Sequence, residues 1–136
     1  MVLILLQELR QLDMWLNLLD HFFSALHLLI IGFNLLGWIW PATRRSHLWC
    51  VLLTAASWLG LGIWFGIGYC PLTDWQWQVK SKLGETDLPN SFIKYWVDKM
   101  AGIDSDPVLI DVITAIAFAI VFLLAIYYNI LKKGKR

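Results

Sequence analysis

Charged residues and cysteines are scarce in this 136-residue chain. Only 15% of its residues are charged, two are cysteines, and ten acidic residues nearly balance eleven basic ones. Soluble domains carry about 25% charged residues, and small secreted scaffolds depend on many cysteines. The near-neutral balance also gives no basic surface for nucleic acid. The sequence therefore argues against an ordinary cytosolic enzyme, a disulfide-rich secreted domain and a nucleic-acid-binding protein.

Apolar residues make up 59% of the chain and gather in three long runs. A helix that crosses the hydrocarbon core of a bilayer needs about 20 mostly apolar residues. Three stretches meet that requirement, at about 14–40, 47–69 and 107–131. The sequence therefore predicts an all-α membrane protein with three transmembrane helices, in which residues 1–136 form a single membrane domain.

Residues that begin or end helices flank these runs. Pro41 ends the first run, because a proline cannot continue a helix. We expect Ser46 to cap the second helix, and Asp106 to cap the third with Pro107 in its first position. Residues 1–13 keep leucines at helical spacing, with no basic stretch before them. They indicate an amphipathic lead-in, at the interface or extending the first span, rather than a cleaved signal peptide.

The basic residues predict an orientation. The segment 70–106 has four lysines against six acidic residues, whereas the loop between the first two spans and the C-terminal tail are basic. Basic loops favour the cytoplasmic side, so we expect the N-terminus outside and the C-terminus in the cytoplasm. The basic residues of the loop and tail are Arg44, Arg45, Lys132, Lys133, Lys135 and Arg136.

The outer segment 70–106 should contain one or two short interfacial helices. Thr73 and Gln76 have the spacing of a capping box, so a first helix is expected from there to Leu83. A second helix should begin at about residue 90 or 91 and end before Gly102. Its apolar residues lie on one face, as in a helix that lies on a membrane or caps a bundle.

A stripe of polar residues runs along the first predicted span. Asp20, Ser24, His27 and Asn34 fall within roughly 80° of one another on a helix. Lipid cannot solvate such groups, so we expect the stripe to face other helices. Candidate partners on the other two spans are Thr54, Ser57, Asp111, Thr114 and Asn129.

Two interpretations of the stripe are open. In the first, its groups hydrogen-bond between helices and fix their packing. In the second, Asp20 and His27 form a proton path or a site for a polar headgroup. The three histidines lie at different predicted depths, and no Cys/His cluster has metal-ligand spacing. We therefore expect no haem, other cofactor or metal, and assign no catalytic residue.

Two further features concern helix packing and depth. Gly62 and Gly66 have G-x-x-x-G spacing, which lets a helix of this chain or of a second subunit approach closely. Most of the nine tryptophans fall near the predicted ends of the spans. That placement is typical of an aromatic belt at the two membrane interfaces.

The run Cys70-Pro71-Leu72-Thr73 after the second span carries a family resemblance. Other matching features lie before and after it, at Asp20, His27, Phe33, Gly37, Arg44, Arg45, His47, Trp58 and Phe92-Ile93-Lys94-Tyr95-Trp96. With these features the chain resembles the small bacterial integral membrane family known as domain of unknown function 2784, from about residue 16 to 133. The resemblance implies a multi-pass protein of the bacterial inner membrane, and it implies no activity.

One departure from that family bears on function. The family usually has a glutamate three residues after the threonine, where this chain has Gln76. A capping box accepts either residue, whereas acid–base chemistry would need the carboxylate, so the departure favours a structural role.

Two functions are expected from these observations. The first is a non-enzymatic accessory or structural subunit, in contact with the bilayer and with a membrane-protein partner or a second copy. The alternative is a membrane enzyme or carrier for a lipid-like or quinone-like substrate, with Asp20 and His27 in proton transfer.

Overall fold

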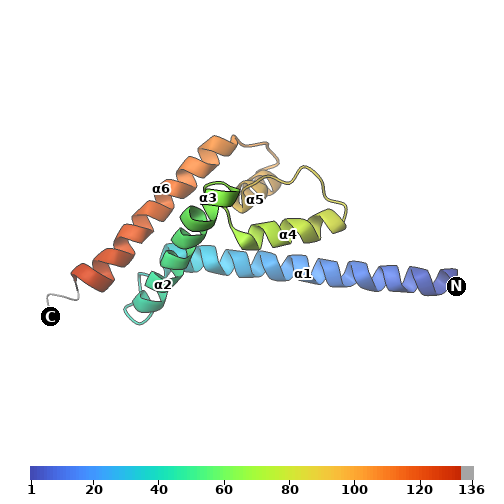
Figure 1. Ribbon diagram of the computed structural model, residues 1–136, viewed down its shortest axis with the longest axis horizontal. Helices are drawn as coiled ribbons and strands as arrows, with labels where there is room; N and C mark the ends of the chain where they lie inside the picture. The colour runs from blue at the N-terminus through green and yellow to red at the C-terminus, as the bar shows by residue number, and fades with distance from the viewer. Residues whose placement is uncertain (133–136) are drawn as a thin grey trace.

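The computed structural model describes residues 1–132, and within that range the chain is helical and has no strand (Figure 1). The prediction of an all-α protein is confirmed. Three helices are long and apolar enough to span a membrane, at Val2–Leu36, Arg44–Phe65 and Pro107–Leu131. The elements are α1 (Val2–Leu36), α2 (Arg44–Ala55), α3 (Gly62–Phe65), α4 (Pro71–Lys82), α5 (Phe92–Ala101) and α6 (Pro107–Ile126). A π-helical segment, Ala56–Leu61, joins α2 to α3, and another, Tyr127–Leu131, extends α6.

Helix α1 includes the lead-in and the first predicted span in one continuous element of 35 residues. At 1.5 Å per residue it is roughly 52 Å long, well beyond the roughly 30 Å of a bilayer core. It ends at Leu36, before Pro41, because the chain turns at Gly37. Residues 1–15 are exposed, and Figure 1 shows this end of α1 extending away from the other helices. The lead-in therefore extends the first helix.

The turn after α1 determines where α2 begins. Thr43, rather than Ser46, precedes its first residue, so the prediction of a Ser46 cap was wrong. The Thr43 hydroxyl donates to the carbonyl oxygens of Gly37 (2.7 Å) and Trp40 (3.1 Å). These bonds close the turn between α1 and α2, and α2 starts three residues earlier than predicted.

The second span ends at Phe65, and the chain then turns back along it. Gly66 and Gly68 have φ values of 104° and 88°, in the region that favours glycine. The Ser57 hydroxyl donates to the Tyr69 carbonyl oxygen at 2.9 Å, so the chain has returned to the level of Ser57 before α4 begins. Segment 70–106 therefore starts beside the middle of a spanning helix.

The caps of the short helices were predicted with mixed success. Helix α4 begins at Pro71 after an extended Cys70 and has no side-chain cap, so the predicted capping box of Thr73 and Gln76 was wrong. Both of those side chains are buried. Helix α5 begins after Ser91, whose hydroxyl accepts from the Lys94 amide, and it ends before Gly102, as predicted.

The predicted start of α6 is confirmed, because the Asp106 carboxylate accepts from the Leu109 amide at 2.8 Å and Pro107 is the first residue. Helices α2 and α6 run side by side in opposite directions (Figure 1). The Trp58 and Phe118 rings pack between them, with centroids 4.9 Å apart. Helix α4 lies along α1 and runs antiparallel to it, which places α4 against the polar stripe.

Candidate functional site

The N-terminal half of the polar stripe, Asp20 and Ser24, faces α4. Gln76 of α4 is fully buried, and its Nε2 donates to Asp20 Oδ1 at 2.8 Å and to Ser24 Oγ at 2.7 Å. The prediction that these two groups face another helix is confirmed, but the helix is α4 and not a second span. Gln76 reaches them because the return turn brings α4 back alongside α1.

A buried lysine extends this contact. Lys80 lies one helical turn after Gln76 and is only 2% exposed. Its Nζ is 3.0 Å from Asp20 Oδ2 and 3.0 Å from Glu85 Oε1. The Tyr95 hydroxyl donates to the other Glu85 oxygen at 2.9 Å. Asp20, Lys80, Glu85 and Tyr95 thus form a chain of polar contacts from α1 through α4 to α5.

Lys80 and Glu85, the two members of this ion pair that lie outside the spans, favour their charged forms. Burial lowers the pKa of Lys80, but its contacts with Tyr95, Asp20 and Glu85 outweigh burial and raise this pKa well above its ordinary value. Burial raises the pKa of Glu85, but hydrogen bonds from Lys80 and Tyr95 outweigh it and leave this pKa below its ordinary value. The contact is therefore ionic at neutral pH.

His27 lies deeper on α1 and meets the family motif. Its Nε2 is 3.7 Å from Cys70 Sγ, and its ring stacks on Phe92 of α5 with centroids 4.0 Å apart. Two buried atoms here, His27 Nδ1 and Gln76 Oε1, have no hydrogen-bond partner among the described residues. A thiol beside an imidazole is one arrangement that supports nucleophilic chemistry.

The Cys70-Pro71-Leu72-Thr73 motif forms the start of α4. Cys70 is extended, and Pro71 occupies the first helical position, where its fixed φ suits a helix. Thr73 is buried and Leu72 half-buried. The motif therefore positions the end of α4 that packs against His27.

The C-terminal end of the stripe, at Asn34, joins α1 to α2. Asn34 Nδ2 donates to Thr54 Oγ1 at 3.0 Å, which confirms Thr54 as its partner. The Asn34 carbonyl oxygen accepts from Nε2 of the fully buried His47 at 2.8 Å. This end of α1 is therefore held by side-chain bonds to the second span.

The other candidate partners make no hydrogen bond to the stripe within residues 1–132, so those predictions were wrong. Ser57 bonds to the return turn, and Thr114 bonds to the Ile110 carbonyl of its own helix. Asn129 Nδ2 donates to the Arg44 carbonyl oxygen at 3.0 Å. Asp111 lines a cavity of about 340 Å³ beside α5, away from the stripe.

Gly62 and Gly66 lie at the end of the second span. A Cβ on Gly62 would lie 3.1 Å from Ile67 Cα, in the return turn. A Cβ on Gly66, which follows the last residue of α3, would meet nothing within 4 Å. The described contacts thus explain Gly62 through the return turn, and a role for the pair in packing between subunits stays a prediction.

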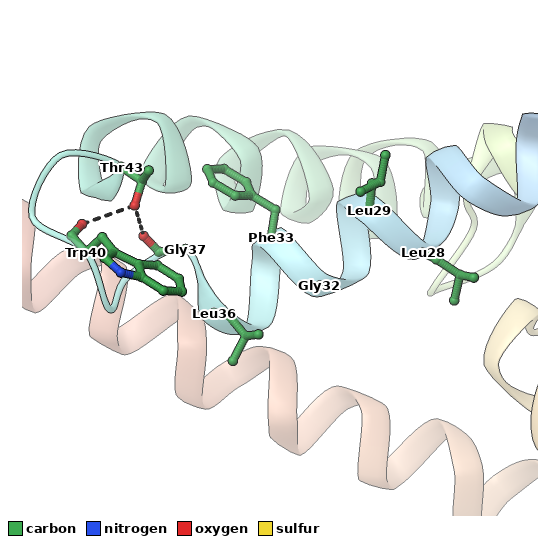
Figure 2. Close-up of a pocket in the computed structure, with 8 residues that line it drawn as sticks. All are labelled: Leu28, Leu29, Gly32, Phe33, Leu36, Gly37, Trp40 and Thr43. Carbon is green, nitrogen blue, oxygen red and sulfur yellow. Dashed lines mark hydrogen bonds between the residues drawn. The ribbon is translucent and has the colours of Figure 1, made fainter.

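A groove of about 350 Å³ lies near the C-terminal end of α1 (Figure 2). Its walls are almost entirely apolar, and it closes at the turn between α1 and α2. The lining residues are Leu28, Leu29, Gly32, Phe33, Leu36, Gly37, Trp40 and Thr43. Within residues 1–132, no three His, Cys, Asp or Glu side chains gather as metal ligands.

Lys80, Glu85 and Tyr95 were not predicted as partners of the stripe. Lys80 and Glu85 entered the predictions only as charges of the outer segment. One available signal was the spacing of Thr73, Gln76 and Lys80, which places them on one face of a helix. A polar face on a helix beside a membrane span indicates a polar partner on that span.

Comparison with known proteins gives one match. A family model described as "Protein of Unknown function (DUF2784)" matches residues 17–130. No curated protein and no solved structure matches the chain. The matched range includes the stripe, the Cys70 motif and the contact residues Gln76, Lys80, Glu85 and Tyr95.

Proposed function

Because the chain belongs to the family of domain of unknown function 2784, whose description assigns no activity, we propose a function from its own contacts. We infer that it is a non-enzymatic membrane protein, an accessory or structural subunit of a larger assembly. The observation that supports this proposal most directly is the hydrogen bonding of the Asp20 carboxylate. Both of its carboxylate oxygens are bonded to side chains of α4.

Those bonds favour a packing role. A general base must reach the proton that it removes from a substrate. Asp20 instead accepts from Gln76 and forms an ion pair with Lys80. Breaking the pair would leave the lysine charge in a nearly dry site, which is costly. Asp20 and Ser24 are therefore best understood as the part of the stripe that holds α4 against α1.

The exposed part of α1 supports a partner. Leu5, Leu9 and Leu12 are exposed and continue the helical row of Leu16, which is buried. The polar residues of this segment begin only at Gln7, and leucines at helical spacing continue among them. A row that is covered by α4 at one end and uncovered at the other is suited to packing against another protein.

We propose the bacterial inner membrane as the location, with the N-terminus outside and the C-terminus in the cytoplasm. The bond from Asn129 to Arg44 supports this orientation, because it brings the basic loop and the end of α6 together. Lys133, Lys135 and Arg136, which the same prediction uses, lie outside the described residues.

The experiment is purification of the full chain from native membranes in mild detergent, followed by mass measurement of the intact complex. The proposal expects a complex larger than the chain alone. The change Leu9→Ser should release the partner, whereas Leu3→Ser, at an exposed leucine that lies off the row, should not. A strictly monomeric protein without a co-purifying partner would overturn the proposal.

A second candidate function is a membrane enzyme or carrier for a lipid-like or quinone-like substrate. It is favoured by the unpartnered buried atoms His27 Nδ1 and Gln76 Oε1, next to the Cys70 thiol. It requires that Asp20→Asn and His27→Ala abolish a cellular phenotype while the amount of folded protein stays unchanged. Loss of folded protein together with the phenotype would support the packing role instead.

A further inference from the structure

The end of the molecule that carries Arg44 has positive charge without acidic residues. The chain has no Asp or Glu between Asp20 and Asp74, and none after Asp111. Arg44, Arg45 and Lys132 therefore lie in a part of the chain that supplies no carboxylate counter-ion. A cationic cluster of this kind at the end of a spanning helix bundle attracts anions from its surroundings, such as anionic lipid headgroups.

Arg44 is held in a fixed position. Its Nε donates to the Trp38 carbonyl oxygen at 3.0 Å, and its guanidinium lies over the Tyr128 ring, 4.2 Å from the centroid. The Trp38 ring stacks on the same tyrosine with an interplanar angle of 14°. The guanidinium is thus oriented before any ligand binds. Arg45, by contrast, is exposed, with no such contact among the described residues.

A second cation shares that ring. Lys132 Nζ lies 5.3 Å from the Tyr128 centroid, so two positive charges converge on one aromatic side chain. The bond from Asn129 to the Arg44 backbone keeps the two helices that carry them together. Two cations near one ring raise the local positive potential, which favours an anion beside them.

We propose that Arg44 and Lys132 bind the phosphate of an anionic phospholipid headgroup. A planar guanidinium matches phosphate oxygens with two parallel hydrogen bonds, and Nε is already used, so the terminal nitrogens provide these bonds. Lys132 adds the point charge. The Tyr128 ring stabilises both cations and sets their spacing.

The surroundings indicate a lipid rather than a soluble phosphate. Trp40, Ile130 and Leu131 are exposed large apolar side chains near the cluster in sequence, at the ends of spanning helices. The apolar groove in Figure 2 closes at Thr43, the residue before Arg44. An acyl chain in this groove would have its headgroup near the basic end of the bundle. This site is separate from the stripe and does not depend on the proposed function.

The test is thermal unfolding of the detergent-solubilised full chain, titrated with phosphatidylglycerol or with phosphatidylcholine. Each variant is compared with its own lipid-free sample, so that a loss of intrinsic stability is separated from a loss of binding. Phosphatidylglycerol should stabilise the wild type more than phosphatidylcholine does. Arg44→Gln should weaken the apparent affinity roughly tenfold, as expected for the loss of charge-assisted hydrogen bonds. Arg45→Gln, an equal change of charge, should alter it less than about twofold.

Further variants keep the test decisive if Arg44→Gln does not fold. Tyr128→Leu leaves the net charge unchanged but removes the shared ring, and Lys132→Gln removes the second cation from an exposed position. Both should weaken the response to phosphatidylglycerol. Equal losses in Arg44→Gln and Arg45→Gln, or no preference for the anionic lipid, would overturn the proposal. Equal stabilisation by soluble glycerol phosphate would overturn the assignment to a lipid.

Discussion

At the scale of single residues, Gln76 shows how an amide can be preferred to an acid inside a helical membrane protein. Its amide nitrogen is a donor, and both groups that it meets on α1 accept hydrogen bonds. An ionised glutamate would offer only acceptors to Asp20. From the sequence, Gln76 was predicted to cap a helix, because capping depends on neighbouring residues alone and its contact with Asp20 does not.

This interpretation predicts that Gln76→Glu destabilises the protein at neutral pH by about 1–3 kcal/mol, through a lost hydrogen bond and repulsion from Asp20. Burial and the neighbouring carboxylate would raise the pKa of the new glutamate in the folded state. The penalty should therefore be absent below about pH 4 and grow as the pH rises above that. The measurement is the free energy of unfolding in mixed micelles as a function of pH.

Gln78→Glu is the matched control for this change. Gln78 lies on the same helix and also bonds to an aspartate, Asp74, but it is exposed to solvent. Solvent screens the new repulsion there, so the change should cost less than about 1 kcal/mol. Similar costs at the two positions would contradict the role given to Gln76.

The turn after α1 needs a glycine at position 37. A Cβ on Gly37 would lie 2.6 Å from the Phe33 carbonyl oxygen and 2.9 Å from the buried His47 ring. Gly37→Ala should therefore destabilise the protein by about 1–3 kcal/mol, because neither neighbour can move freely. Gly32→Ala, where nothing lies within 4 Å, should be neutral or slightly stabilising in a helix. Thermal unfolding in detergent measures both changes, and equal effects would show that the turn does not need this glycine.

At the scale of elements, the features that could be predicted from the sequence are those that depend on neighbouring residues, such as helix caps. Ser91 and Asp106 cap helices through bonds to amides three residues later, and such local patterns can be recognised from sequence. The position of α4 depends instead on the backward turn at Gly66 and on contacts between residues 52 to 60 positions apart, such as Gln76 with Ser24 and Lys80 with Asp20. Periodicity and capping rules carry no information on such distant pairs.

The end of α5 is held by a charge cluster that should respond to acid. Lys94 Nζ bonds to Asp98 (2.6 Å), Asp104 (2.7 Å) and the Ser105 carbonyl oxygen (2.6 Å). Hydrogen bonds from Lys94 and Ser105 lower the pKa of Asp98 to about 2. A depressed acid pKa adds stability that is present above the ordinary value near 4 and is lost as the pH falls through the folded-state value.

We therefore expect residues 92–105 to loosen between about pH 4 and pH 2, before the spanning helices do. Amide hydrogen exchange across this pH range, corrected for its intrinsic rate, measures the change. Asp98→Asn should abolish most of this acid dependence, whereas Asp87→Asn, at an exposed position away from the cluster, should preserve it. Uniform loosening of α5 and α6 would contradict a local cluster.

At the scale of the whole molecule, the three spans were visible in the sequence because each is a long apolar run. The polar stripe was visible too, because its residues share one face of a helix. The helix that covers the stripe, α4, was not visible, because its sequence resembles that of an ordinary polar segment. The proposed orientation follows from the placement of the basic residues, and cysteine labelling tests it.

That test uses single cysteines in an otherwise cysteine-free chain. Ser81→Cys and Ala42→Cys place exposed thiols on α4 and on the turn between the first two spans. With the N-terminus outside, a membrane-impermeant thiol reagent should label the first in intact cells and the second only after permeabilisation. The reverse pattern would show the opposite orientation.

The central claim is that the polar stripe holds α4 against α1, and a double-mutant cycle on Asp20 and Lys80 tests it most directly. The unfolding free energies of Asp20→Asn, Lys80→Met and the double variant are measured in mixed micelles. Each single change should cost about 1–3 kcal/mol, since it removes a charge-assisted hydrogen bond from a buried partner. The double variant should cost less than the two together, with a coupling of at least about 1 kcal/mol. Additive costs would contradict the claim that this pair holds the two helices together.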